Sequence, residues 1–203
     1  MNPSFSNSTV LFGGSFDPVH LGHLHVAQEC LASFPLGTEL FFVPAGMSPG
    51  KKSVASPQDR LQFLELATQN RGFQIWEFEL TRQGPSYTLE TLLEAHRLGA
   101  RKANLYWLLG ADSYASFPTW RSPEKIRELA QLVVVTRPGQ NLERQQDEDI
   151  LLKIPQHPAS SSAVREACSR GEIPFESLPE PLFVHLRHLT LQSKNPYAIP
   201  LGK

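Results

Sequence analysis

The stretch that decides the fold is Val10-Leu-Phe-Gly-Gly-Ser-Phe-Asp-Pro-Val-His-Leu-Gly-His23. It begins with an apolar run, Val10 to Phe12, which predicts the end of a buried strand. The two glycines that follow lack a Cβ, so the backbone can turn sharply there and come close to a ligand. Pro18 ends the strand pattern, and a helical pattern follows from about residue 21 to residue 34.

Two imidazoles stand at the start of that helix. His20 and His23 are three residues apart, so both side chains can face the same way. Free backbone N–H groups and the positive end of the helix dipole lie there too. With the glycine pair, this arrangement predicts a site for polyphosphate. Two alternatives stay open: a zinc site built from His20, His23, His25 and Asp17, and a turn with only a structural role.

The same residues resemble a known signature. Gly13-Gly-Ser-Phe-Asp-Pro-Val-His20-Leu-Gly-His23 is similar to the motif of the HxGH nucleotidyltransferases, which include pyridine-nucleotide, phosphopantetheine and choline-phosphate enzymes. The resemblance implies that a nucleotide α-phosphate is joined to a phosphate on an acceptor and that pyrophosphate leaves. It also implies that His20 and His23 are catalytic, and that ATP is bound by Gly13, Gly14, Ser15, Phe16, His20 and His23.

The composition is that of an ordinary globular protein, with 203 residues, 40% of them hydrophobic and 19% charged. A formal net charge of −1 disfavours broad nucleic-acid binding. No apolar run approaches the roughly 20 residues that cross a bilayer, so no membrane partner is expected. Residues 1–8 have no charged and apolar segments typical of a secretory signal. Cys30 and Cys168 are too few for a disulfide framework, which favours a cytoplasmic setting.

Short apolar strands alternate with amphipathic helices along the rest of the chain. Further strands are expected at 40–43, 73–80, 105–109, 132–135 and, at an edge, 150–154. Further helices are expected over 56–68, 88–98, from 122, over 160–171 and over 181–188. This alternation predicts an α/β fold, a Rossmann-like doubly wound parallel sheet in a single domain. The domain is expected over 9–190, between a disordered lead-in at 1–8 and a tail at 191–203, with a mobile polar loop at 140–149.

The loop after the second strand, residues 44–54, is rich in Pro, Gly, Ser and Lys. Ligands of open α/β sheets bind at the carboxyl ends of the strands, where this loop is expected. Lys51 and Lys52 are therefore candidate phosphate contacts, and a solvated surface pair is the alternative.

Later segments resemble one branch of that superfamily, the bacterial nicotinate-nucleotide adenylyltransferases. Gly84-Pro-Ser-Tyr-Thr88, Gly110-Ala-Asp-Ser113, Trp120, Thr136-Arg-Pro-Gly139 and Ser160-Ser-Ser-Ala-Val-Arg165 match it in order and spacing. The resemblance extends from Val10 to about Leu186 and implies the nucleotidyltransferase fold. It adds Gly110, Asp112, Ser161 and Arg165 to the ATP site. It assigns the acceptor to Lys51, Tyr87, Thr88, Trp120 and Arg137.

These matches make chemical sense one by one. Trp120 offers a flat face on which a pyridine ring can stack, with core packing as its alternative role. Tyr87 and Thr88 can hydrogen-bond a nicotinate carboxylate. Asp112 suits ribose hydroxyls, with capping of the next helix as the alternative. Arg165 stands at a second helix N-terminus, which can hold the β- and γ-phosphates of ATP.

Two positions depart from the family pattern. Gly50 stands where the family usually has a histidine before the lysine, and Arg121 stands where an aromatic residue is common. The acceptor site is therefore expected to differ in shape.

The expected reaction transfers AMP from ATP to nicotinate mononucleotide, giving deamido-NAD and pyrophosphate. Mg²⁺ is expected to arrive with ATP and not in a site built by the protein. Two alternatives remain: the same chemistry on nicotinamide mononucleotide, and a non-catalytic nucleotide sensor. Whether the chain forms a homo-oligomer is left open.

Overall fold

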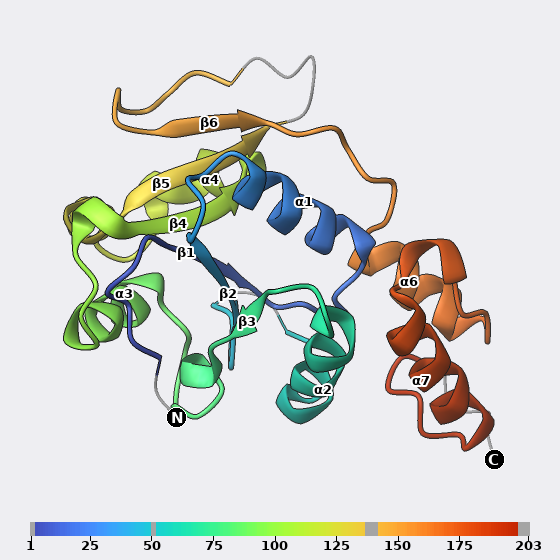
Figure 1. Cartoon of the computed structure of the whole chain (residues 1–203). Helices are drawn as coiled ribbons and strands as arrows, with labels where there is room; N and C mark the ends of the chain where they lie inside the picture. Colours follow the sequence, from blue (N-terminus) through green and yellow to red (C-terminus); the bar gives the residue numbers. More distant parts are fainter. Residues whose placement is uncertain (1–2, 50–51, 137–141, 199–203) are drawn as a thin grey trace.

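The computed structural model describes residues 3–49, 52–136 and 142–198. A six-stranded sheet runs through its centre in the order β3-β2-β1-β4-β5-β6, and every neighbouring pair is parallel (Figure 1). The strands are β1 (Thr9–Gly14), β2 (Glu39–Pro44), β3 (Gln74–Ile75), β4 (Leu105–Gly110), β5 (Gln131–Thr136) and β6 (Ile150–Lys153). The predicted doubly wound parallel sheet is therefore confirmed.

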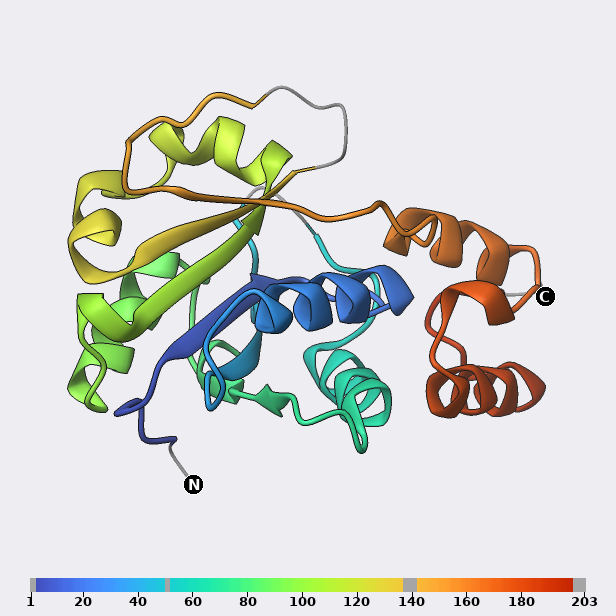
Figure 2. The same ribbon diagram turned by 45° about the horizontal axis from the view of Figure 1, so that its top comes forward.

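Helices cover both faces of the sheet, because each strand alternates its side chains between two apolar clusters. Val10 and Phe12 of β1 face one cluster and Leu11 faces the other. The first cluster includes α1 (Leu21–Ala32), α2 (Pro57–Thr68), α6 (Ser161–Ser169) and α7 (Glu180–Leu191). The second includes α3 (Thr88–Arg97), α4 (Ala111–Ser116) and α5 (Pro123–Leu129). In Figure 2, α6 and α7 lie at one end of the molecule, beside α1 and α2.

Several helices begin and end where local chemistry indicates. The Ser56 hydroxyl accepts a hydrogen bond from the amide of Asp59 at 3.1 Å, and Pro57 opens α2. Ser160 caps α6 in the same way, accepting from the amide of Ala163 at 3.2 Å. Gly99 follows α3 with a φ of +105°, a conformation that glycine adopts without strain.

Three expected elements need correction. The strand over 73–80 shrinks to β3, because the chain turns into a 3₁₀ helix at Glu77–Glu79. The segment Gly110–Ser113 is not only a turn, since it opens the short helix α4. The last helix runs to Leu191 and not only to residue 188.

Two segments that were expected to lack order are packed. Phe5, in the lead-in, is completely buried, with ring centroids 4.8 Å from Trp76 and 5.2 Å from Phe41. In the polar loop, Asp149 is buried, forms an ion pair with Arg127 and accepts a hydrogen bond from the Tyr114 hydroxyl. A sequence window sees neither contact, because all the partners are distant in the chain. Within the three described ranges, no helix is long and apolar enough to cross a membrane.

Candidate active site

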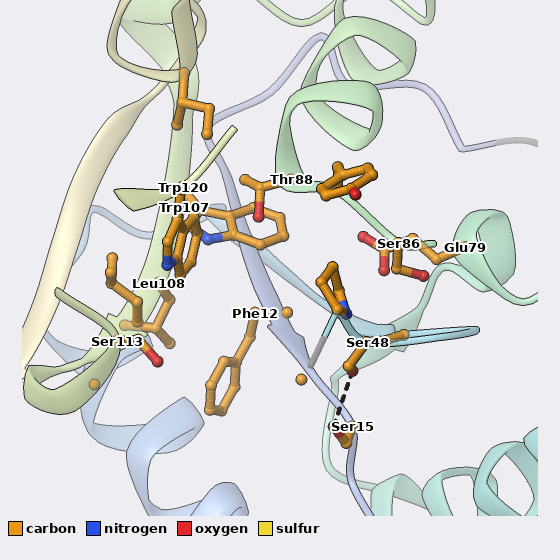
Figure 3. Close-up of a pocket in the computed structure, with 18 of the residues that line it drawn as sticks. Phe12, Ser15, Ser48, Glu79, Ser86, Thr88, Trp107, Leu108, Ser113 and Trp120 are labelled. Atoms are coloured by element: carbon orange, nitrogen blue, oxygen red, sulfur yellow. Dashed lines mark hydrogen bonds between the residues drawn. The ribbon is translucent and has the colours of Figure 1, made fainter. Parts of the chain in front are cut away.

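A pocket of about 710 Å³ opens at the carboxyl ends of β1, β2 and β4. The strand order reverses there, since β1 pairs with β2 on one side and with β4 on the other. Open α/β sheets bind their ligands at such a switch point. Residues from all three strands or the segments after them line the pocket, including Gly14, Ala45 and Gly110. Figure 3 shows the aromatic side chains of Trp107 and Trp120 on one side, and Ser15 hydrogen-bonded to Ser48 on another.

The glycine pair at the end of β1 makes room for aromatic rings. A Cβ on Gly13 would lie 2.4 Å from Cζ2 of Trp107, and one on Gly14 would lie 2.9 Å from Cζ of Phe16. The sharp change of direction comes later than expected, at Phe16, which has a φ of +46° and is buried. A buried non-glycine residue in this region stores strain of about 1–3 kcal/mol. The loop after β1 is therefore held by its surroundings.

Asp17 fixes this loop through its carboxylate. The carboxylate accepts hydrogen bonds from the amides of Val54 and Ala55, at 2.7 and 3.1 Å, and from the Tyr197 hydroxyl at 2.9 Å. These contacts join the loop to the segment before α2 and to the segment after α7. Asp17 therefore acts as a structural anchor, and it is 5% exposed.

Arg60 supplies a second anchor from α2. Its side chain is completely buried and donates to the carbonyl oxygens of Ser15, at 2.7 Å, and Gly46, at 3.2 Å. Burial lowers the pKa of its guanidinium, and the nearby Asp17 partly opposes that effect. Arg60 thus ties the loop after β1, residues 15–20 (the β1 loop), to the start of the loop after β2, residues 45–49 (the β2 loop), on either side of the pocket.

The two imidazoles of the motif lie against each other at the start of α1, with ring centroids 3.8 Å apart and planes tilted by 32°. The backbone N–H of His20 donates to Nδ1 of His23 at 3.3 Å. Because Nδ1 accepts, this geometry assigns the proton of neutral His23 to Nε2. His23 lines the pocket.

His20 sits deeper than its partner and is only 8% exposed. A Cβ on Gly22 would lie 2.9 Å from its Nδ1 and 3.1 Å from the carbonyl oxygen of Ala159, so glycine leaves space for the ring. Burial, with a smaller effect of the nearby His157, lowers the pKa of His20 from 6.5 to about 4. At neutral pH His20 is uncharged and donates through one nitrogen only.

Helix α6 docks directly on the β1 loop. The Ser161 hydroxyl donates to the carbonyl oxygen of Pro18 at 2.9 Å. Nη1 of Arg165 donates to the carbonyl oxygen of Asp17 at 2.6 Å, and its Nη2 donates to the Ser162 hydroxyl at 3.2 Å. The N-terminus of α6 and that of α1 thus lie on the same loop, which gives the loop two helix N-termini suited to anions.

The opposite side of the pocket is aromatic and lies at the start of α3. Tyr87 and Thr88 line it, and Thr88 is the first residue of α3. The first amides of a helix have no partner within the helix and attract negative charge. Trp107 and Trp120 also line the pocket, and Figure 3 shows their rings close to Thr88. This part of the pocket suits a flat ring that carries an anionic or polar substituent.

A buried carboxyl group completes the lining. Glu79 is 5% exposed and accepts a hydrogen bond from the Thr91 hydroxyl. Burial raises the pKa of Glu79, while hydrogen bonds from Thr91 and Ser86 act in the opposite direction. The Ser86 hydroxyl in turn accepts from the amide of Gly46 at 2.9 Å, which joins the β2 loop to the segment before α3.

The pocket brings together many, but not all, of the residues singled out from the sequence. Eight of them line it: Gly13, Gly14, Ser15, His23, Tyr87, Thr88, Gly110 and Trp120. Five others lie outside its lining: Phe16 and His20 are buried, Ser161 and Arg165 bond the β1 loop, and Asp112 is exposed in the first turn of α4. Lys51, Arg137 and the departure at Gly50 lie outside the described residues.

Sequence reasoning missed three residues of the site or its support. The sequence pattern assigns Trp107 to a strand and gives it no other role. In the structure it lies on the same face of β4 as Leu105 and Leu109, and it lines the pocket. Arg60 falls three residues before Phe63, on the buried side of α2, and a charge at such a position was a usable signal. Glu79 had no local signal, because its burial depends on contacts with α3.

The zinc alternative does not fit the geometry. Nε2 of His25 is 3.0 Å from the carbonyl oxygen of Pro155, and the Asp17 carboxylate is turned toward Val54, Ala55 and Tyr197. Over residues 3–49, 52–136 and 142–198, no three His, Cys, Asp or Glu side chains gather to hold a metal ion.

Comparison with known proteins places the chain in a family. A family model described as cytidylyltransferase-like matches residues 11–167. The nicotinic acid mononucleotide adenylyltransferase of Plasmodium falciparum, solved with NaAD, superposes with a TM-score of 0.72 over 93% of this chain and 98% of its own. At 16% identity that likeness speaks for the fold alone. The chain is a nucleotidyltransferase of the cytidylyltransferase-like family.

Relatives with higher sequence identity define the family more narrowly. A probable nicotinate-nucleotide adenylyltransferase of Methylacidiphilum infernorum is 33% identical over 192 residues, covering 91% of this chain and 92% of its own. One from Thermus thermophilus is 40% identical over 162 residues, covering 79% and 86%. The chain therefore belongs to the nicotinate-nucleotide adenylyltransferases.

Proposed function

We propose that the protein transfers AMP from ATP to nicotinate mononucleotide, releasing pyrophosphate and forming deamido-NAD, a step of NAD biosynthesis. The observation that carries this proposal is one pocket with an imidazole and the β1 loop on one side and a Trp-lined wall at a helix N-terminus on the other. A dinucleotide product needs both: donors for phosphates and a flat apolar surface for a pyridine ring.

The acceptor phosphate is itself the nucleophile, so the protein needs to position and stabilise charge and does not form a covalent bond. His23 is proposed to donate through Nε2 to phosphate oxygens as negative charge develops. His20, which is more deeply buried, is proposed to orient His23 through contact between the two rings and to donate one hydrogen bond to a phosphate oxygen. Ser161 and Arg165 are proposed to bring the N-terminus of α6 to the β- and γ-phosphates.

The acceptor is proposed to stack on Trp120, with its carboxylate at the amides that open α3 beside Tyr87 and Thr88. Asp112 keeps its proposed role toward ribose, and Lys51 and Arg137 keep their proposed roles toward the acceptor. Magnesium is proposed to enter as part of the ATP complex, because Glu79 is the only carboxylate side chain in the described lining and it is already bonded to Thr91. Bound there, Mg²⁺ would neutralise charge on the leaving pyrophosphate. A cytoplasmic location is proposed from the two free, buried cysteines.

The deciding experiment measures pyrophosphate release from ATP and Mg²⁺ with either nicotinate or nicotinamide mononucleotide as acceptor. We expect release with the acid, and a loss of at least roughly a hundredfold in His20→Ala and His23→Ala, since one well-aimed donor contributes about 3–4 kcal/mol to the barrier. His25→Ala is the matched control, because His25 lies on the same helix but faces Pro155.

Each other outcome has a definite meaning. Release with the amide alone would keep the chemistry and overturn the acceptor. Binding of ATP without release with either acceptor would replace the enzyme by a nucleotide sensor. Near-normal rates in both histidine variants would overturn the roles assigned to these side chains.

A further inference from the structure

Arg121 stands at the ring-binding side of the pocket, at a position where the resemblance to the family leads one to expect an aromatic residue. It follows Trp120 directly and lines the pocket with Tyr87 and Thr88. Its side chain is 56% exposed, so a ligand can reach it. None of the other residues of the described pocket lining is a Lys or an Arg. This cationic side chain needs an explanation.

Two contacts hold the guanidinium in place. Its Cζ lies 4.8 Å from the centroid of the Tyr87 ring, and its Nη1 donates to Oε1 of Glu90 at 2.9 Å. The Tyr87 ring thus supports the cation from within the pocket wall, and Glu90 holds one of its edges. A guanidinium has five N–H donors. The hydrogen bond to Glu90 uses one, which leaves several for a ligand.

The charge of Arg121 is not cancelled by a carboxylate of its own. Glu90 is shared, since Arg82 also approaches its Oε2 at 3.5 Å. One carboxylate therefore faces two guanidinium groups. Glu79 is the other acid on this side of the pocket, and its buried carboxyl group already accepts a hydrogen bond from Thr91.

We propose that Arg121 selects the acid form of the acceptor by donating to the carboxylate on its pyridine ring. This inference rests on the proposed function and adds a specificity residue to it. A planar guanidinium matches a carboxylate edge to edge, whereas a carboxamide presents no charge and turns an N–H₂ group toward the arginine. Phosphate recognition by Arg121 is the competing role, and Arg121 adjoins Trp120 and Tyr87, not the β1 loop.

The test compares kcat/KM for nicotinate and nicotinamide mononucleotide in the wild type and in Arg121→Gln. We expect the acid-to-amide ratio to fall about ten- to hundredfold, the range of one charge-assisted hydrogen bond. Arg121→Lys keeps the positive charge but loses the planar pair of N–H donors, so its acid-to-amide ratio should lie between those of the wild type and Arg121→Gln.

Arg82→Gln is the matched control. Arg82 pairs with the same Glu90 and also packs over an aromatic ring, that of Phe78 at 5.2 Å, but it is not part of the pocket lining. Its removal should change the acid-to-amide ratio much less than the removal of Arg121. An equal loss for both acceptors in Arg121→Gln, or no loss for the acid, would overturn the proposal.

A second readout separates this proposal from the proposed function. Binding of each mononucleotide is measured by calorimetry without ATP, so no turnover is needed. If the wild type released no pyrophosphate with either acceptor, the proposed function would fail. In that case, weaker binding of the acid alone by Arg121→Gln would still support the role of Arg121. Equal binding of the acid by the wild type and by Arg121→Gln would overturn that role.

Discussion

His20 couples the stability of the protein to pH. Its pKa is lowered from 6.5 to about 4, chiefly by burial. Between these values the unfolded chain binds a proton that the folded chain does not, so stability is complete above pH 6.5 and is lost as pH falls toward 4. From the shift of pKa, the loss amounts to at most about 3 kcal/mol.

This effect is isolated by comparing wild type with His20→Asn in urea unfolding at pH 7 and pH 4.5. The free energy of unfolding of the wild type, relative to the variant, should drop by about 2 kcal/mol at the lower pH. His25→Asn serves as the control, and its difference from the wild type should change much less. An equal wild-type advantage at both pH values would contradict burial of an uncharged His20.

At the residue scale, the sequence identified the pair of imidazoles but not their difference in depth. The spacing of His20 and His23 predicts a shared face at the start of a helix. Which of them is buried depends on Gly22 and on the carbonyl of Ala159, which reaches the motif from the loop before α6. Contacts across such a distance leave no pattern in a local window.

At the scale of elements, the pocket depends on how α2 holds two loops together. Arg60→Met should keep the volume and apolar stem of this side chain but lose the hydrogen bonds to Ser15 and Gly46. We expect the free energy of unfolding to fall by about 2–4 kcal/mol, because two buried carbonyl groups lose their partner. The KM for ATP should rise, since the β1 loop loses one of its anchors.

Ser56→Ala is the comparison for this prediction. It removes the N-cap of the same helix, which should reduce stability by about 1 kcal/mol while leaving the KM for ATP unchanged. The measurements are urea unfolding and steady-state kinetics. If Arg60→Met lost stability but kept the wild-type KM, α2 would support the fold without positioning the loop.

Element boundaries were predictable where chemistry is local. Helix ends are predicted within a few residues by the caps Ser56 and Ser160 and by Gly99. Strands are predicted equally well by the apolar runs of β1, β2, β4 and β5. The largely alternating polarity of Phe73–Leu80 predicts a strand, but the structure has a 3₁₀ helix at Glu77–Glu79. The carbonyl oxygen of Glu79 packs against Gly46, so closely that a Cβ on Gly46 would lie 2.3 Å from it. This contact with a distant residue favours the 3₁₀ helix, and it leaves no local signal in the sequence.

At the scale of the whole molecule, the chain returns to its first loop near its end. The alternation of strands and helices was enough to predict a doubly wound parallel sheet, since that pattern has few other solutions. It was not enough to predict that the segment after α7 is packed. Asn195 and Tyr197 are 6% and 4% exposed. Their partners precede them by up to 180 residues.

The hydrogen bond from Tyr197 to Asp17 therefore couples the packing of the segment after α7 to the β1 loop. Tyr197→Phe removes one donor from the buried Asp17 carboxylate and keeps the ring. We expect the free energy of unfolding to fall by about 1.5–3 kcal/mol, the contribution of a hydrogen bond to a charged group. Urea unfolding measures it. Tyr106→Phe is the control, because that ring packs on Phe34, with centroids 4.7 Å apart, away from Asp17. Equal stability of the two variants would contradict the anchor, since the amides of Val54 and Ala55 would then suffice to hold Asp17 and the loop that carries His20.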